Sequence, residues 1–383
     1  MRAAGIIAEY NPFHNGHAYQ IAQTRAAGYD HIAVAMSPDA VQRGEPSIFS
    51  KWARTEAALA CGADLVVELP APWALASAEG FAMGGVFLLD ALGCVEALSF
   101  GSESGDLAVL ESCAAACLAV EPGLPAQLKG AAVSYAAARE TAVAAMVGAE
   151  AASALSRPND TLGVEYLKAI ARLGSPMGAF TVQRAGAGHH SAALDGETAS
   201  AGAIRALMAR EGFAAAKGYL PPAARGIFRA AYLSQGLALM LNLEAAAVYR
   251  LRTMGVEDFA RLPDVNGGLE RRFFRETRHP AALSELLERV RTRRYPLSRI
   301  RRAVYSALLG LTREDAAGRP PCIRVLGFNE RGKAMLKAAK LRGKLPVCHS
   351  LAKLARDFPR LAEIETLCSD LFLLAGASKR SIR

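Results

Sequence analysis

The sequence predicts an α/β protein with three successive parts: an open parallel sheet, a mainly helical basic region, and a short α/β unit at the end. Two observations support this prediction. In the first half of the chain, short apolar runs alternate with helix-like stretches, which is the pattern of strands joined by crossover helices. After Pro222 the spacing of apolar residues becomes helical and arginines become frequent.

Each expected element follows from its local pattern. Short apolar runs predict strands at 5–9, 31–36, 65–69, 97–100 and 180–183. Apolar residues three or four positions apart predict helices at 17–28, 51–61 and 78–92. Residues 103–154 are rich in alanine, and we expect them to form helices packed on the sheet.

A domain boundary is expected near residue 215, because the turn-forming run Gly218-Tyr219-Leu220-Pro221-Pro222 separates the two patterns. Residues 1–215 would form the sheet domain and residues 216–383 the mainly helical, arginine-rich region. A strand at 323–326 and a helix at 332–339 would make the terminal α/β unit.

The composition fits a globular protein, since 52% of the 383 residues are hydrophobic and 21% are charged. The sequence has no signal-peptide pattern and no uncharged apolar run of about 18 residues, so we expect a cytoplasmic protein without a membrane partner. Its seven cysteines are scattered and form no C-x-x-C pair, so no metal site is predicted.

The formal net charge of +9 indicates a polyanionic partner. Arginines gather between residues 271 and 302, next to Phe273, Phe274 and Tyr295, which suits a surface that neutralises phosphates and stacks bases. A solvated helix face explains the same pattern equally well. The candidate RNA-binding residues are Arg271, Arg272, Arg293, Arg294, Arg299, Arg301 and Arg302.

The segment from Glu9 to His17 (EYNPFHNGH) lies where the first strand ends and the first helix begins. Ligands of parallel sheets bind at such carboxyl ends, and the unpaired N–H groups of the first helical turn favour phosphate. His14 and His17 share one helix face, and Gly16 permits close approach of the backbone. A simple capping role is the alternative; zinc would need a further ligand, and no obvious one is nearby.

This segment matches the H-x-G-H signature of the nucleotidyltransferase superfamily, which includes class I aminoacyl-tRNA synthetases, and so implies a Rossmann-like domain. Nearly the whole chain resembles one branch of it, the bacterial tRNA(Met) cytidine acetate ligase family. The resembling segments are Val41 to Pro46, Lys51 with Arg54, Asp64 to Pro70, Ser77 to Glu79, Ser99 to Glu103, Pro158 to Leu167, Gln183 to Gly188, Gly267 to Glu270 with Arg272, Arg293 to Tyr295, and Arg299 to Arg302.

The resemblance implies a two-step reaction. Acetate attacks the α-phosphate of ATP, which enters with Mg2+, to give acetyl-adenylate and pyrophosphate; N4 of the wobble cytidine of elongator tRNA(Met) then attacks the acetyl carbonyl. The implied catalytic residues are His14, His17, Lys51 and Arg54. The implied ATP contacts are Ile7, Ala8, Glu9, Tyr10, Asn11, Pro12, Phe13, His14, Asn15, Gly16, His17, Ala18, Tyr19, Gln20, Gly101, Asn159 and Arg184.

Two segments depart from the family pattern. The chain has Ser37-Pro38-Asp39-Ala40 where Ser-Gly-Asn-Phe is usual, which removes a backbone donor and adds a negative charge. Ser200 to Arg205 lacks the usual threonine, which is replaced by Gly202. We hypothesise altered substrate choice or a reduced rate, with ATP binding retained.

Two other functions stay open: adenylyl transfer to a small metabolite, and RNA binding without catalysis. Two glycine-rich segments offer weaker signals. Gly327 to Ala334 resembles a P-loop but lacks its Ser or Thr, so we expect a plain strand-to-helix turn. Gly186 to His190 lacks the dinucleotide fingerprint, and a simple loop is as good an interpretation as a ligand contact.

Overall fold

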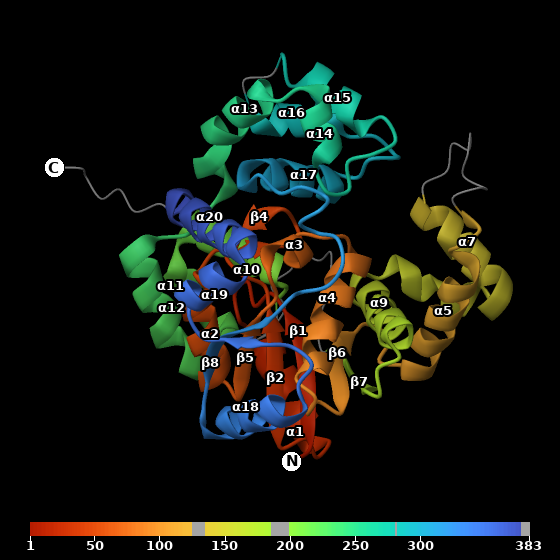
Figure 1. The fold of residues 1–383 in the computed structure, drawn as a ribbon, viewed down its shortest axis with the longest axis vertical. Coiled ribbons are helices and arrows are strands. Elements are labelled where there is room, and N and C mark those ends of the chain that lie inside the picture. The colour runs from red at the N-terminus through yellow and green to blue at the C-terminus, as the bar shows by residue number, and fades with distance from the viewer. Residues whose placement is uncertain (125–134, 185–198, 280–281, 377–383) are drawn as a thin grey trace.

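A seven-stranded sheet forms the centre of the computed structural model, which describes residues 1–124, 135–184, 199–279 and 282–376 (Figure 1). The order across the sheet is β7 (Gly178–Gln183), β6 (Ala97–Ser102), β1 (Ala3–Ala8), β2 (His31–Met36), β5 (Leu65–Glu68), β8 (Ile323–Phe328) and β9 (Val347–Cys348). The first five strands are parallel to one another. The α/β class and the expected strands are confirmed.

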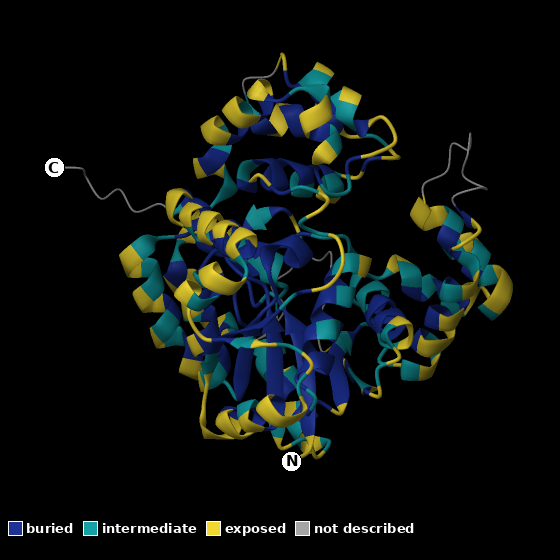
Figure 2. Cartoon of the chain, viewed as in Figure 1, coloured by how far each residue is buried: buried dark blue, intermediate teal, exposed yellow. Residues whose placement is uncertain are grey.

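Helices cover both faces of the sheet, which explains why central strands such as β1 and β5 are buried along their whole length (Figure 2). One face packs with α4 (Ala78–Ala91), α9 (Pro158–Leu173) and α18 (Glu330–Arg342). The other face packs with α1 (Asn15–Ala26), α2 (Lys51–Ala60) and α12 (Pro222–Gln235). The remaining elements are β3 (Ala40–Val41), β4 (Glu45–Pro46), α3 (Ala71–Ala74), α5 (Leu107–Val120), α7 (Tyr135–Val147), α8 (Ala149–Ala152), η1 (Ser153–Ser156), α10 (Ala201–Glu211), α11 (Phe213–Ala216), η2 (Lys217–Tyr219), η3 (Met240–Leu243), α13 (Glu244–Thr253), α14 (Val256–Arg261), α15 (Leu269–Glu276), α16 (Leu283–Val290), α17 (Leu297–Leu309), α19 (Leu351–Asp357) and α20 (Pro359–Ala375).

The winding of the sheet reverses at β1. The chain passes from β1 to β2 and β5 on one side, and later to β6 and β7 on the other. Ligands of such sheets bind in the crevice at the carboxyl ends of the two strands that flank the reversal. The fold therefore places its natural ligand site where β1 and β6 end.

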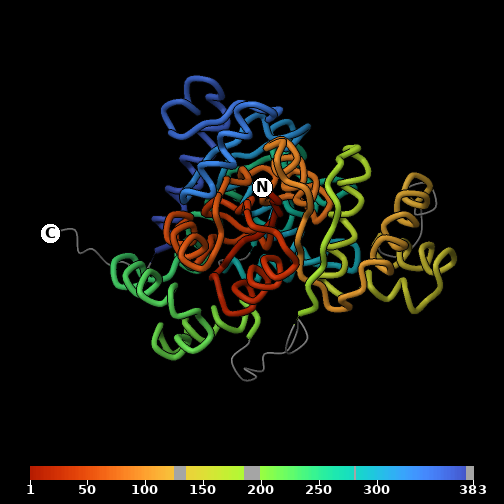
Figure 3. The backbone as a smooth tube through the Cα atoms, turned by 90° about the horizontal axis from the view of Figure 1, so that it is seen from below, coloured from red at the N-terminus to blue at the C-terminus, as the bar shows by residue number. Residues whose placement is uncertain are grey.

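The helices between residues 107 and 152 differ from their expected position. Helix α5 packs on α9, and α7 and α8 pack on α5, so that α9 lies between this group and the sheet (Figures 1 and 3). Buried ion pairs fix this arrangement: Arg139 of α7 lies 2.5 Å from Glu165 of α9, and Lys168 lies 2.5 Å from Glu121. The alanine-rich pattern predicted helices correctly but not their partner.

The terminal α/β unit is not separate, because β8 pairs with β5 in antiparallel register and extends the sheet. Helix α12 also packs on α2 of the first half. A domain boundary near residue 215 stays a prediction, although segments on both sides of it share one sheet. None of the helices in the described ranges is long and apolar enough to cross a membrane.

Helices α13 to α17 have a core of their own, which includes Phe259, Phe273 and Ile300. We call them the helical module. The module lies beyond the end of the sheet where β1 finishes, and the short β3–β4 hairpin lies between the two (Figure 1).

Candidate functional site

His14 and His17 lie together at the start of α1, directly after β1. His14 is the N-cap residue, and its Nδ1 accepts a hydrogen bond from the backbone N–H of Gly16 (3.1 Å). The backbone N–H of His14 in turn donates to Nδ1 of His17 (3.2 Å). The two imidazole rings stack with their centroids 3.8 Å apart. The capping role considered from the sequence is thus present, and it orients both rings.

These contacts also determine the proton positions. Because Nδ1 of each ring accepts a backbone hydrogen bond, the hydrogen of each neutral ring resides on Nε2. Burial, together with the positive charges of Arg184 and Arg205, lowers the pKa of His14 to about 3. Burial, His14 and Arg184 lower the pKa of His17 well below its usual value. Both histidines are therefore neutral donors at neutral pH.

Close packing supports this pair of rings. A Cβ atom at Gly16 would lie 3.0 Å from Cε1 of His14, so a larger residue would displace the ring. Tyr10 and Phe13 pack against His17, with ring centroids 4.8 and 5.5 Å from it. Among the other residues of this segment, Ile7, Ala8, Asn11 and Pro12 are buried, Glu9, Asn15 and Ala18 are half-buried, and Tyr19 is exposed. Gln20 points back to the sheet and donates to the carbonyl of Ser99 (3.1 Å).

Two arginines flank the histidines. Arg184 follows β7, its backbone N–H donates to the carbonyl of Ser102 (2.9 Å), and its side chain passes Gly101. Arg205 of α10 donates to the carbonyl of Asn11 (2.9 Å) and pairs with Glu45 (3.2 Å). The structure thus brings His14, His17, Gly101 and Arg184 to the carboxyl ends of β1 and β6.

Asn159 is positioned by a carboxylate that the sequence analysis did not assign to the site. Oε1 of Glu103 accepts from the backbone N–H and from Nδ2 of Asn159 (3.1 and 2.7 Å), which caps α9. The carboxylate of Asp160 in turn accepts a hydrogen bond from the backbone N–H of Glu103 (2.8 Å). Glu103 lies in a segment that resembles the family, and that was its sole sequence signal.

Lys51 and Arg54 lie in a different environment from the one expected of phosphate contacts. Lys51 is 2% exposed, and its Nζ donates to Glu68 (2.7 Å). Arg54 is fully buried and donates to the backbone carbonyls of Glu9, Phe49, Ser37 and Pro38. The guanidinium therefore links the residues that follow β1 to the residues that follow β2. Arg54 contacts the backbone beneath the site.

Asp39, the unusual acidic residue, is also turned inward. Its Oδ1 accepts from the backbone N–H of Lys51 (2.6 Å), and its Oδ2 accepts from Oγ of Ser369 on α20 (2.9 Å). Because Asp39 is 2% exposed, its charge faces Lys51 and not a ligand. At the second departure, Ser200 caps α10 by accepting from Ala203 (3.1 Å).

The arginines of the helical module divide into two groups. Arg272, Arg299 and Arg302 are half-buried and hold the module together through Val290, Asp264 and Asn266. Arg271, Arg293 and Arg294 are exposed, and Arg301 is half-buried. The exposed group is accessible to a polyanion, whereas Arg272, Arg299 and Arg302 also have partners within the module; RNA binding by either group stays a prediction.

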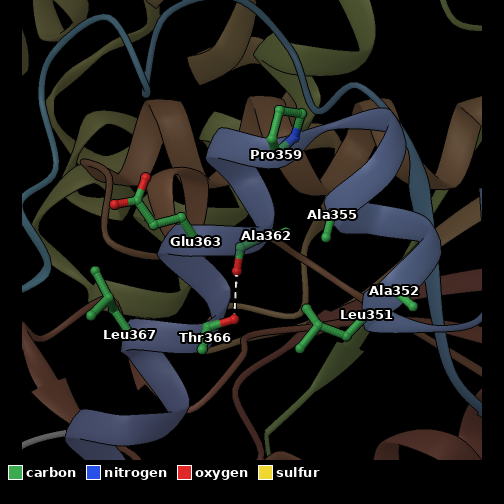
Figure 4. Close-up of a pocket in the computed structure, with 8 residues that line it drawn as sticks. All are labelled: Leu351, Ala352, Ala355, Pro359, Ala362, Glu363, Thr366 and Leu367. Carbon is green, nitrogen blue, oxygen red and sulfur yellow. Dashed lines mark hydrogen bonds between the residues drawn. The ribbon is translucent and has the colours of Figure 1, made fainter.

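One groove and one glycine-rich turn lie outside this site. A shallow apolar groove of about 580 Å³ lies between α19 and α20, and its lining contains none of the motif residues (Figure 4). The P-loop-like segment is a strand-to-helix turn: Asn329 caps α18, and a Cβ at Gly332 would collide with the carbonyl of Asp64. Gly186 to His190 lie outside the described residues. Within the described ranges, no three metal-ligating side chains converge.

Comparison with known proteins agrees with this geometry. The family model described as HIGH Nucleotidyl Transferase matches residues 1–382. The tRNA(Met) cytidine acetate ligase of Caldanaerobacter subterraneus is 36% identical and covers 98% of this chain and 96% of its own. The corresponding ligase of Syntrophotalea carbinolica is 40% identical, with 94% and 87% covered.

Solved structures give the same result. Thermotoga maritima TmcAL in its apo form superposes with a TM-score of 0.89 at 31% identity, covering 96% of this chain and 92% of that one. The same protein bound with alpha-thio ATP gives a TM-score of 0.85 at 32% identity, with 97% and 92% covered. The chain therefore belongs to the HIGH nucleotidyl transferase family and, within it, to the tRNA(Met) cytidine acetate ligases.

Proposed function

We propose that this protein activates acetate with ATP and transfers the acetyl group to N4 of the wobble cytidine of elongator tRNA(Met). The observation that carries the proposal is the pair of neutral histidines at the start of α1. Backbone hydrogen bonds to Nδ1 orient both rings, so that Nε2–H of each ring can donate to a ligand. Relatives that are named for this reaction support it. A cytoplasmic location, where ATP and tRNA meet, is part of the proposal.

In the first step, an acetate oxygen attacks the α-phosphorus of ATP and pyrophosphate leaves. Negative charge develops on the phosphoryl oxygens in the transition state, and preorganised donors stabilise it more than they stabilise ATP itself. Nε2 of His14 and His17 and the guanidinium of Arg184 are the donors we assign to this task. Neutral imidazoles donate a hydrogen bond without a proton leaving the ring.

In the second step, the cytidine amine attacks the acetyl carbonyl and AMP leaves, so no covalent enzyme intermediate is required. Catalysis then depends on holding amine and adenylate in line. Gly101, Asn159 and the segment from Ile7 to Gln20 are proposed to hold the nucleotide. The exposed Arg271, Arg293 and Arg294 of the helical module are proposed to bind the tRNA backbone, with Arg301 beside them.

Lys51 and Arg54 are proposed as positioning residues, because their cationic groups are buried among protein acceptors. ATP is expected to enter as its magnesium complex. The carboxylates near the histidines, Glu9 and Glu45, are engaged by Gln42 and Arg205, so we route no step through a protein-bound metal.

The test combines two readouts on one preparation. Purified protein is incubated with ATP, magnesium, labelled acetate and elongator tRNA(Met), and pyrophosphate release and labelled N4-acetylcytidine are measured together. Both products, lost together in His14→Ala, would support the proposal. Pyrophosphate without labelled RNA would indicate a different acceptor, such as a small metabolite. Binding of tRNA with neither product would indicate a non-catalytic RNA-binding protein.

A further inference from the structure

The β3–β4 hairpin connects two parts of the molecule that the proposed reaction must bring together. One side of it contacts the nucleotide site: the backbone N–H of Gln42 donates to Oε1 of Glu9 (2.8 Å), and Glu45 pairs with Arg205 (3.2 Å). Arg205 also holds the carbonyl of Asn11 within the H-x-G-H segment. The hairpin is thus fixed to the end of β1.

The other side of the hairpin touches the helical module. Gly44 has φ +73° and approaches α17 so closely that a Cβ atom would lie 2.4 Å from the carbonyl carbon of Arg301 and from the nitrogen of Arg302. Such an approach leaves no room for any side chain larger than hydrogen. The hairpin tip is therefore docked on the backbone of α17, beside the arginine pair.

Arg43 lies at the tip of this hairpin and does not stabilise the fold through contacts with the described residues. Its side chain is exposed, and it makes no ion pair or side-chain hydrogen bond within the part of the chain that the structure describes. The neighbouring Arg205 and Arg302, by contrast, are paired with Glu45 and Asp264. Arg301 of α17, adjacent to the docked Gly44, is likewise without such a contact in the described ranges.

We propose that Arg43 and Arg301 form one phosphate-binding patch at the junction between the nucleotide site and the helical module, and that this patch guides the acceptor RNA to the adenylate. The inference rests on the proposed function. An RNA held on the exposed arginines of the module must pass the hairpin to reach the end of β1. Two guanidinium groups that have no ion-pair partner among the described residues suit a phosphodiester, and the docked Gly44 fixes the relative position of their backbones.

The number of phosphates that a protein neutralises can be read from the salt dependence of RNA binding. Each phosphate contact contributes about 0.7 to 0.9 to the slope of log K against log salt concentration. We therefore expect Arg43→Ala to reduce this slope by about 0.8, and Arg43→Lys to restore it. Binding of labelled tRNA(Met) is measured by fluorescence anisotropy over a potassium chloride series.

Arg210→Ala is the matched control, because Arg210 is an exposed arginine of α10 that pairs with its neighbour Glu211. It should leave the slope unchanged. Gly44→Ala tests the docking: it retains every charge but forces the hairpin off α17, so it should reduce the slope as Arg43→Ala does. The slope of the Arg43→Ala, Gly44→Ala double variant should then be no lower than the slope of either single variant.

Acetylation by the unaltered protein is measured first. If it neither binds tRNA(Met) nor acetylates it, the proposed function is wrong and this inference is wrong with it. If it acetylates tRNA(Met) but Arg43→Ala keeps the full slope, the inference alone is overturned. An additive loss in the Arg43→Ala, Gly44→Ala double variant would likewise refute the claim that the docked hairpin positions Arg43.

Discussion

Replacing His14 by asparagine separates its two tasks. Nδ1 of His14 caps α1 by accepting from Gly16, while Nε2 carries the hydrogen that we assign to the phosphoryl oxygens. Asparagine is among the best N-cap residues, so His14→Asn retains the cap. Its amide is shorter than the imidazole, so the variant loses the donor at the position of Nε2. Since the backbone N–H of residue 14 remains, His17 keeps the contact that orients it.

The expected effect is kinetic. Loss of one donor to a developing oxyanion costs about 2.7 to 4 kcal/mol, or roughly 10²- to 10³-fold in rate. His14→Ala loses the cap as well, which costs about 0.5 to 2 kcal/mol of stability in addition. We therefore expect both variants to be slow, and His14→Ala alone to melt at a clearly lower temperature.

Acetate-dependent exchange of labelled pyrophosphate into ATP measures the first step without tRNA, and a thermal melt of each variant serves as its control. If His14→Asn folded like the unaltered protein and exchanged pyrophosphate at an undiminished rate, the assignment of Nε2 as a donor would be refuted. Slow exchange that appeared only in His14→Ala would identify His14 as a cap and nothing more.

Three further outcomes follow from the buried ionisable groups. Lys51→Met should lower the free energy of unfolding by about 3 to 5 kcal/mol in urea titrations, because it breaks a buried pair with Glu68, whereas the exposed Lys333→Met should change it by less than about 0.5 kcal/mol. Asp39→Asn, which introduces the usual family residue, should lower stability by about 1 to 3 kcal/mol and leave the KM for ATP unchanged, because Asp39 contacts Lys51 and Ser369; a changed KM would instead mean that Asp39 reaches the ligand. The pKa of His14 is about 3 in the folded protein, against its ordinary value of 6.5, so below pH 6.5 the unfolded chain binds a proton that the folded chain does not. The free energy of unfolding should therefore fall as pH drops from 6.5 towards 3. Urea titrations at pH 7.5 and 5.5 should show that the unaltered protein loses about 1.4 kcal/mol more of this free energy than His14→Asn does. Equal losses would contradict the lowered pKa.

Most of the correct predictions from the sequence rest on local patterns of apolar and motif residues. Strands such as β1 and β5 were recognisable because they are short apolar runs buried on both faces. The histidine segment was recognisable because it lies at a strand-to-helix junction. The direction of each ring was not predictable, because it depends on which nitrogen accepts a backbone hydrogen bond.

Long-range contacts account for what the sequence analysis missed. Arg54 carries the same charge whether it faces solvent or four backbone carbonyls, so its burial has no local signature. Glu103 lies in a segment that resembles the family, but its contact with Asn159 at the start of α9 could not be predicted from the sequence. The pairing of β8 with β5 joins residues that are distant in the sequence; Arg324 and Glu68, for example, are 256 positions apart.

That last pairing matters while the protein is being made. A ribosome adding about 5 to 20 residues per second takes roughly 13 to 50 s to cover the 256 positions from Glu68 to Arg324. During this interval the apolar β5 has a free edge, and a free edge can pair with other chains and aggregate. A fragment that stopped near residue 215 would keep this edge permanently open, so the nucleotide-binding half is expected to be insoluble when expressed without its last strands. Strand β8 thus protects the edge of β5 in the complete protein.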